Sequence, residues 1–317
     1  MDDRTLILDI QRMSTEDGPG IRTTVFFKGC SLSCAWCHNP ESISVKIDIE
    51  WLENRCIGCK TCIKVCKNNA VIYTDKGIYI DRDNCSSCLS CVRECPGNAI
   101  EAKGKYYDVD TLFNELIKDK AYFLNSGGGI TASGGEALLH PDFVRSIFKK
   151  LKEEGINTAI DTAGFVDKNS FDKILPYTDI VLYDMKIFDS INHKKYTGAG
   201  NEKILENLLY IADYVRKQGS KVIWIRTPVI PAATAFEENI ISIGDFISKN
   251  ILDVTSRWEL CAFNNLCRDK YRRLNKEWIF KGTNLMKKSE MESLLNAAKK
   301  TGAGEIASWS GATEIEG

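Results

Sequence analysis

The cysteine residues are the feature of this 317-residue sequence that most directly suggests chemistry. There are 13 of them, and eleven lie between Cys30 and Cys95, whereas only Cys261 and Cys267 fall outside that stretch. In a secreted chain so many cysteines would suggest disulfides, but the N-terminal residues MDDRTLILDIQRM resemble neither a signal peptide nor a membrane span. Clustering this tight, in a chain with only 3 histidines, predicts thiolate-bound metal. Cys261 and Cys267 are expected to be packing or exposed thiols.

Three cysteines, Cys30, Cys34 and Cys37, form a C-x3-C-x2-C motif directly after an apolar segment at residues 23–29. Three closely spaced thiolates can hold three irons of a cubane [4Fe–4S] cluster. No fourth cysteine or histidine lies in register, and His38 is badly placed because it directly follows Cys37. The fourth iron would then have an open position for a chelating small molecule, so this cluster would be a reaction centre. A zinc site is the competing interpretation, but a closed zinc site needs four ligands.

Eight further cysteines form two copies of the bacterial ferredoxin pattern C-x2-C-x2-C-x3-C. In that pattern three thiolates of each run hold one cubane, while the fourth reaches across to the other cluster. Both clusters would have every iron bound by protein, so they would relay electrons to the reaction cluster or serve as a scaffold. We expect one cluster on Cys56, Cys59, Cys62 and Cys95, and the other on Cys85, Cys88, Cys91 and Cys66.

Apolar strands alternate with helical patterns on both sides of these two runs, which is typical of a parallel sheet covered by helices. Six such units make about three-quarters of a closed barrel. We therefore expect an α/β fold with a partial (β/α)6 TIM-like barrel, with a doubly wound open sheet as the alternative. Strands are predicted at residues 23–29, 129–133, 157–163, 179–186, 221–229 and 257–263. Helices are predicted at residues 109–120, 141–155, 201–219 and 236–250.

Residues 41–104 interrupt this pattern, because they hold the two ferredoxin-like runs, a hairpin-like segment at residues 71–80, and few helical signals. We expect residues 1–40 and 105–317 to form the two parts of the partial barrel. Residues 41–104 are expected to form an inserted ferredoxin-like domain with two [4Fe–4S] clusters.

The overall composition excludes several classes of partner. The sequence is 44% hydrophobic and 27% charged, and its net charge is −1 from 42 basic and 43 acidic residues. This balance leaves no broad basic field for nucleic acid and no acidic tail. We expect a cytoplasmic, monomeric protein that binds neither nucleic acid nor a membrane.

Polar residues follow the other predicted strands. The second strand ends in the sequence SGGE at residues 133–136, where glycines allow a close backbone approach and a carboxylate could accept hydrogen bonds from an amine. Alone, this segment could be an ordinary turn, and single charged residues are usually solvated. Barrels of this class, however, place their chemistry at the carboxyl ends of the strands. The later strands carry Asp161, Thr162, Asp184, Lys186 and Arg226 at or near those ends.

The C-x3-C-x2-C motif after the first strand of a partial barrel resembles the radical S-adenosylmethionine superfamily. In that superfamily, the amino and carboxylate groups of S-adenosylmethionine occupy the open iron, and one electron cleaves the sulfonium to methionine and a 5′-deoxyadenosyl radical. The resemblance makes Cys30, Cys34 and Cys37 the catalytic cluster ligands. It implies three [4Fe–4S] clusters in all, together with S-adenosylmethionine.

By the same resemblance, residues at the strand ends would contact the cofactor. Glu136 would bind the methionine amino group, and Asn264 stands where family members commonly have a histidine, so any acid–base role at that position would be lost. The implied cofactor-binding residues are Gly134, Gly135, Glu136, Asp161, Lys186, Arg226 and Asn264. The residues Asp161, Thr162 and Asp184 resemble a monovalent-cation site of the family.

Residues 17–23 (DGPGIRT) and 125–136, with the sequences FFKGC and CHNPE around the trio, closely resemble the glycyl-radical-enzyme activating enzymes. In that family the N-terminal segment helps to hold the glycine loop of the protein substrate, so Asp17 is expected to contact the peptide. The resemblance implies an anaerobic activase that abstracts hydrogen from one glycine of a glycyl radical enzyme, with flavodoxin or ferredoxin as electron donor. A hydroxyproline or glycerol dehydratase is the partner we expect.

Two other functions compete with this hypothesis. A radical S-adenosylmethionine enzyme with auxiliary clusters could act on a small molecule, but the DGPGIR segment argues against it. A simple electron-transfer protein would use only residues 41–104, and it would leave the C-x3-C-x2-C trio and the SGGE segment without a role.

Overall fold

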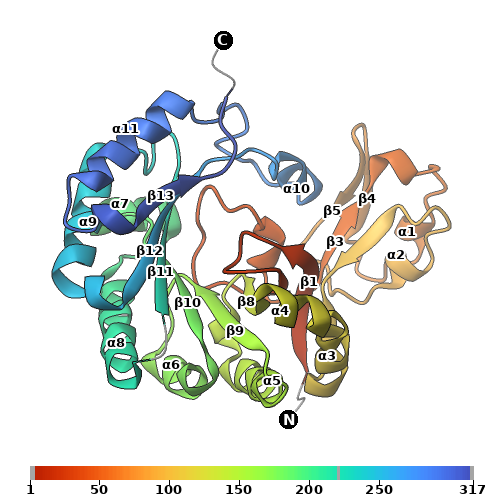
Figure 1. Cartoon of the computed structure of the whole chain (residues 1–317). Helices are drawn as coiled ribbons and strands as arrows, with labels where there is room; N and C mark the ends of the chain where they lie inside the picture. Colours follow the sequence, from red (N-terminus) through yellow and green to blue (C-terminus); the bar gives the residue numbers. More distant parts are fainter. Residues whose placement is uncertain (1–3, 220–221, 315–317) are drawn as a thin grey trace.

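The computed structural model describes residues 4–219 and 222–314. Its main feature is an open sheet whose nine strands, among these residues, lie in the order β13-β12-β11-β10-β9-β8-β2-β1-β7 (Figure 1). The strands from β2 through β8 to β13 pair in parallel, and β1 and β7 are antiparallel additions at one edge. The strands are β1 Thr5–Ser14, β2 Arg22–Phe27, β7 Lys105–Tyr107, β8 Gly129–Gly134, β9 Asn157–Thr162, β10 Ile180–Asp184, β11 Val222–Val229, β12 Thr255–Ala262 and β13 Ala307–Ser310.

The mostly parallel α/β sheet predicted from the sequence is confirmed. The six predicted strands correspond to β2 and β8 to β12, and they follow one another across the sheet in chain order. A doubly wound sheet reverses its order at a switch point, so that alternative is wrong and the arrangement is consistent with a partial barrel. The predicted strand at residues 221–229 begins one residue before β11, and Lys221 lies outside the described residues.

Three strands of this nine-stranded sheet were not predicted, namely β1, β7 and β13. Over most of its length β1 alternates partly buried with exposed residues, because one face of this antiparallel part of the sheet is open to solvent. Such alternation is a weaker signal than the continuous burial of β8.

Nothing in the described residues forms a helix long and apolar enough to cross a bilayer.

Helices cover the outer side of the curved sheet, where α5, α6, α8 and α9 form a row (Figure 1). The predicted segment 109–120 is broken: the side chain of Asp108 caps the first helix by accepting from the Thr111 amide, and a 3-10 turn at residues 117–119 separates it from the next. The helices of the main lobe are α3 Val109–Leu116, α4 Lys120–Ser126, α5 Pro141–Glu153, α6 Lys168–Ile174, α7 Ser190–Thr197, α8 Glu202–Gln218, α9 Glu237–Asn250, α10 Arg268–Arg273 and α11 Lys288–Lys299.

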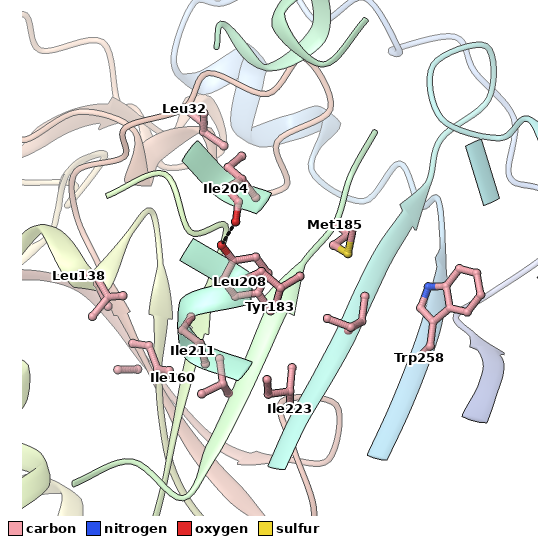
Figure 2. Packing of buried hydrophobic residues seen from close by; sticks show 14 of the residues in the cluster. Leu32, Leu138, Ile160, Tyr183, Met185, Ile204, Leu208, Ile211, Ile223 and Trp258 are labelled. Carbon is pink, nitrogen blue, oxygen red and sulfur yellow. Dashed lines mark hydrogen bonds between the residues drawn. The ribbon is translucent and has the colours of Figure 1, made fainter. Parts of the chain in front are cut away.

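The main core lies between the sheet and these helices. Figure 2 shows Ile160, Tyr183 and Ile223 from adjacent strands packed near Leu208 and Ile211 of α8. All five residues are 0% exposed, so the burial of each side chain stabilises the fold by on the order of 1.5–3 kcal/mol. The hydroxyl of Tyr183 is satisfied because it donates to the main-chain oxygen of Ile204 at 2.6 Å.

Residues 48–103 form a smaller lobe beside the β1 edge of the sheet (Figure 1). Its own core includes Ile49, Val71, Ile78 and Ile100. The predicted hairpin at residues 71–80 is present, with Thr74 paired to Gly77. The elements are β3 Asp48–Trp51 paired with β6 Ile100–Lys103, β4 Val71–Thr74 paired with β5 Gly77–Ile80, and the short helices α1 Thr61–Lys64 and α2 Ser90–Arg93.

The smaller lobe is an internal repeat whose halves are 29 residues apart in sequence. Lys60 and Leu89 occupy equivalent positions before α1 and α2, and both are left-handed, with φ of 58° and 63°. Asn69 and Asn98 are likewise left-handed, with φ of 52° and 47°. Each half therefore repeats the same backbone path around its cysteine run.

Gly164 is expected to be essential for the packing of the core. It has a φ of +74°, and an added Cβ would lie 1.7 Å from the hydroxyl oxygen of Tyr183. Gly155 has a similar φ of +72° with nothing within 4 Å of an added Cβ, so Gly155→Ala is a matched control for the backbone cost alone. We predict that Gly164→Ala lowers the free energy of unfolding by about 1–3 kcal/mol more than Gly155→Ala, because overpacking adds to the backbone strain. Equal losses in thermal unfolding of the two variants would contradict this.

Candidate active site

A cavity of about 240 Å³ lies at the carboxyl ends of the parallel strands. One side of its wall comes from the loop after β2, and the rest comes from the ends of β8 to β12. The structure therefore brings most of the predicted site residues together. Those on the wall are Cys30, Cys34, Cys37, Gly134, Gly135, Asp161, Thr162, Asp184, Lys186 and Arg226.

The loop that carries the three thiols is held from two directions by main-chain contacts. From α7, the carbonyls of Thr197 and Tyr196 accept hydrogen bonds from the amides of Ser33 and Ala35 at 2.8 and 2.9 Å. From the segment after β12, the indole nitrogen of Trp278 donates to the Ala35 oxygen at 3.1 Å. The loop is therefore ordered by residues far away in sequence.

The cysteines of this trio are partly buried, and this burial raises the pKa of Cys30 to about 11 and that of Cys37 to about 12. Without metal they are protonated at neutral pH, so metal loading must release protons. In the part of the chain that the structure describes, no three His, Cys, Asp or Glu side chains converge on a point that could hold a single metal ion. His38 also lines the cavity, and its Nε2 lies 3.0 Å from the main-chain oxygen of Asn264.

The same cavity wall also carries two ion pairs. Lys186 Nζ lies 2.5 Å from Asp184 Oδ2, and an Arg226 guanidinium nitrogen lies 3.4 Å from Asp161 Oδ1. Burial by itself would lower the pKa of Lys186, but Asp184, Cys34 and Asp161 together outweigh burial, so the net direction is upward. Asp161 also accepts a hydrogen bond from the Ser133 hydroxyl at 2.6 Å. Two cations and two anions around one cavity are complementary to a zwitterionic ligand.

Glu136 lies behind the cavity wall. Its carboxylate is 1% exposed and is not part of the cavity wall. It accepts hydrogen bonds from the hydroxyl of Thr162 at 2.8 Å and from the amides of Ala163 and Leu138 at 3.2 Å. Burial raises the pKa of Glu136 to about 7, and these hydrogen bonds only partly oppose that effect. The carboxylate thus connects the ends of β8 and β9, and its neighbour Thr162 faces the cavity.

The three residues of the expected cation site all lie on the wall, but each is engaged. Asp184 is paired with Lys186, Asp161 is near Arg226, and the Thr162 hydroxyl donates to Glu136. The negative charges of the two aspartates are therefore already offset by Lys186 and Arg226.

Two predicted residues lie away from the wall. Asp17 Oδ2 accepts hydrogen bonds from the hydroxyls of Ser14 and Thr24, each at 2.7 Å, so this side chain shapes the turn between β1 and β2. The side-chain oxygen of Asn264 accepts a hydrogen bond from the Leu266 amide at 3.2 Å, and Asn264 is not on the cavity wall.

One residue expected only to pack belongs to the cavity wall. Cys261, near the end of β12, lines the cavity, and burial raises the pKa of its thiol to about 11. Its position near a strand end was the available signal. Cys267, in contrast, is 3% exposed and belongs to the core.

Two small pockets in the repeat lobe are each lined by four cysteines. Both combine three cysteines of one run with the last cysteine of the other run, as ferredoxin-type ligation requires. Cys62 and Cys91 are buried, whereas Cys59 and Cys88 are exposed. One pocket contains Cys56, Cys59, Cys62 and Cys95, and the other contains Cys66, Cys85, Cys88 and Cys91.

Comparison with known proteins agrees with this geometry. The family model of the Radical SAM superfamily matches residues 24–242. The trans-4-hydroxy-L-proline dehydratase activating enzyme of Clostridioides difficile is 37% identical over 90% of this chain and 92% of its own length. The (2S)-3-sulfopropanediol dehydratase activating enzyme of Klebsiella oxytoca is 36% identical over 90% of each chain. Among solved structures, Streptococcus suis SuiB bound to its precursor peptide SuiA has a similar fold, with a TM-score of 0.52 and 13% identity over 89% of this chain and 46% of that one.

The raised pKa of Glu136 predicts a pH-dependent stability. Because its pKa rises from the ordinary 4.5 to about 7 on folding, the protonated group favours the folded state fully below pH 4.5, and this contribution is lost as the pH rises through 7. Glu136→Gln keeps the shape without the charge. We expect the melting temperature of the variant, measured without cofactor, to fall less than that of the wild type between pH 5 and 8. The exposed Glu206 provides the control Glu206→Gln, and a wild-type slope in Glu136→Gln would contradict the assignment.

Proposed function

Since this chain belongs to the Radical SAM superfamily and, within it, to the glycyl-radical-enzyme activating enzymes, we propose how its own residues carry out the reaction of that family. The enzyme reductively cleaves S-adenosylmethionine to a 5′-deoxyadenosyl radical and abstracts hydrogen from a glycine of a partner glycyl radical enzyme. The observation that carries the mechanism is one cavity that combines three thiols from one loop with two ion pairs from the strand ends.

The trio Cys30, Cys34 and Cys37 fits an iron–sulfur cluster with one open iron. Its three partly buried cysteines line one cavity, and soft thiolates are the donors that such clusters require. When bound, a [4Fe–4S] cluster supplies the electron that cleaves the sulfonium of S-adenosylmethionine. The zwitterionic end of S-adenosylmethionine fits the two ion pairs of the wall, because its amino and carboxylate groups can each meet an opposite charge.

The chain's own residues bind and orient the cofactor. We assign Lys186 and Arg226 to the methionine carboxylate and Asp161 to the ribose, since all three line the cavity. The ion pairs hold these side chains in place before the cofactor arrives, which reduces the entropy lost on binding. The Glu136 carboxylate lies behind Thr162, which is on the cavity wall. We propose that Glu136 binds the methionine amino group from this position beside Thr162.

Gly134 and Gly135 allow the strand end to approach the thiol loop. An added Cβ at Gly134 would lie 2.3 Å from the Phe27 amide nitrogen, and one at Gly135 would lie 2.2 Å from the Gly29 oxygen. Side chains at either position would push β8 away from the loop that leads to Cys30. These glycines therefore set the spacing between the cluster ligands and the cofactor.

The repeat lobe is proposed to be a ferredoxin-like domain at residues 41–104 with two further [4Fe–4S] clusters, so that the enzyme carries three. The crossed sets of four cysteines around two pockets support this assignment. Every iron of these two clusters would have a protein ligand, which suits electron transfer and leaves no position for substrate.

Two contacts complete the proposal. Asp17 would shape the surface that holds the partner's glycine loop, because its carboxylate fixes the turn before β2 through Ser14 and Thr24. A monovalent cation at Asp161, Thr162 and Asp184 would have to replace Lys186 beside Asp184.

For the partner, we propose a dehydratase, with hydroxyproline dehydratase tested before glycerol dehydratase. The two relatives described above activate dehydratases, at 37% and 36% identity. The benzylsuccinate synthase activating enzyme of Thauera aromatica is also 36% identical, over 86% of this chain and 82% of its own length. Sequence identity by itself therefore does not single out one partner enzyme.

The first test removes one ligand of the trio. We expect Cys34→Ala, reconstituted anaerobically and reduced with dithionite, to form no 5′-deoxyadenosine and to lose about four irons per chain, because a cubane holds four. Cys267→Ala, at a buried thiol outside all three cysteine sets, is the control and should retain both properties. Full iron content with undiminished 5′-deoxyadenosine in Cys34→Ala would disprove the site.

The second test identifies the partner. The reduced enzyme and S-adenosylmethionine are mixed separately with hydroxyproline dehydratase, glycerol dehydratase and an arylacetate decarboxylase, and the glycyl doublet is measured by electron paramagnetic resonance. We expect the doublet with a dehydratase and at least about tenfold less with the decarboxylase, since a poorly held glycine loop loses the close approach that hydrogen transfer needs. A stronger signal with the decarboxylase would overturn the preference.

A further inference from the structure

The two halves of the repeat lobe differ in charge. Where the first half has exposed lysines at positions 60, 64 and 67, the equivalent residues 29 positions later are Leu89, Arg93 and Pro96. The second half also has the acidic residues Asp83 and Glu94, where the first has Asn54 and Val65. Because the two halves share one backbone path, this difference does not come from the fold.

The cations of the two halves are also engaged differently. Among the ion pairs of residues 4–219 and 222–314, none includes Lys60, Lys64 or Lys67. The matching Arg93 is turned back onto its own lobe, where its guanidinium donates to the Cys88 oxygen at 3.1 Å and to the Ser90 hydroxyl at 3.2 Å. Only the first half therefore presents lysines to an external partner.

Exposed apolar groups lie among these lysines. Ile57 is 69% exposed and Tyr73 is 53% exposed, and both line the pocket that contains Cys59. Lys60 Nζ lies 4.4 Å from the centre of the Tyr73 ring, so the cation and the apolar groups share one surface. In the second half the residue equivalent to Ile57 is Ser86. An apolar centre with a charged rim is the composition of a protein–protein contact.

Cys59 is exposed, lies two residues before α1, and lines the same pocket as Ile57, Lys60 and Tyr73. Figure 1 places α1 on the side of the small lobe that faces away from the main sheet, whereas the glycine of the partner must reach the cavity between the strand ends. A protein on this outer side could exchange electrons with a group held by Cys59 without blocking that cavity.

We propose that the Cys59 edge, defined by Ile57, Cys59, Lys60, Lys64 and Tyr73, is the docking surface for an acidic one-electron donor protein. The proposal rests on the proposed function, because the four thiols around this pocket must hold a redox centre. The donor is oxidised by one electron and the chain is reduced by one. That electron is consumed when the carbon–sulfur bond of S-adenosylmethionine breaks to give methionine and the 5′-deoxyadenosyl radical. Positive charge at the docking edge accelerates and orients the encounter with an acidic donor.

The internal repeat provides a matched pair of variants for the test. Lys64→Glu and Arg93→Glu change the charge equally at equivalent exposed positions, and Lys60→Glu/Lys64→Glu enlarges the effect. The probes are an acidic flavodoxin and an acidic [2Fe–2S] ferredoxin. Calorimetry with the oxidised donor and the reconstituted enzyme measures binding directly. 5′-Deoxyadenosine formation is then measured with each reduced donor and, separately, with dithionite.

We expect Lys64→Glu to weaken donor binding and raise the KM for the donor by about threefold to tenfold at low salt, as for loss of a complementary charge. Arg93→Glu should change either value by less than about twofold, and the dithionite-driven rate should be the same in all variants because that reductant needs no docking. The effect of Lys64→Glu should diminish at high salt.

Three results would overturn the proposal: equal effects of Lys64→Glu and Arg93→Glu, no charge-dependent binding of either donor to the wild type, or normal donor kinetics with a reduced glycyl doublet on the partner enzyme. The last result would assign the surface to the glycyl radical enzyme. A wild type that forms no 5′-deoxyadenosine even with dithionite would instead refute the proposed function itself.

Discussion

The close approach between the end of β8 and the loop after β2 is the constraint on which the site depends. The amide of Gly135 donates to the Phe27 oxygen at 2.9 Å, and the amide of Glu136 donates to the Gly29 oxygen at 2.7 Å. These bonds continue the parallel pairing of the two strands beyond their ends. They leave no room for a side chain at Gly134 or Gly135. Residues that follow Gly29, including Cys30, are thereby placed beside the charges at the ends of the neighbouring strands.

The charges in the cavity are arranged so that none is buried alone. A buried charge without a partner costs several kcal/mol, and a buried pair is tolerated when its geometry is good. Lys186 with Asp184, and Arg226 with Asp161, meet that requirement in the free protein. A zwitterionic cofactor could exchange partners with these pairs without changing the net charge of the site. The same pairing explains why a cation would have to compete with Lys186.

Contacts from α10 and its neighbourhood join the thiol loop to the small lobe. Tyr271 donates to the Cys37 oxygen at 3.0 Å, and Lys270 Nζ lies 2.7 Å from Glu41 Oε1. From the small lobe, Arg82 donates to the Arg273 oxygen at 3.1 Å. One short helix therefore contacts both the loop of the reaction site and the lobe with the crossed cysteine sets. This arrangement holds the lobe with the crossed cysteine sets in a fixed position relative to the cavity.

The sequence by itself determined what depends on local pattern. Apolar runs identified the six central strands, because buried parallel strands are apolar on both faces. Cysteine spacing predicted the crossed sets around the two pockets, because a C-x2-C-x2-C-x3-C run lets three thiolates surround one cluster and sends the fourth to the other. The lines of polar residues at strand ends followed from chain order alone.

Only the tertiary structure decided the contacts between distant segments. The Glu136 carboxylate is turned toward Thr162, Cys261 lies on the cavity wall, and Trp278 holds the thiol loop at Ala35. Each of these depends on how far one element lies from another in space, a distance that local periodicity does not encode. The antiparallel strand β1 escaped prediction for a related reason: its exposed face leaves a weak apolar pattern, and its pairing with β2 and β7 appears only in the folded chain.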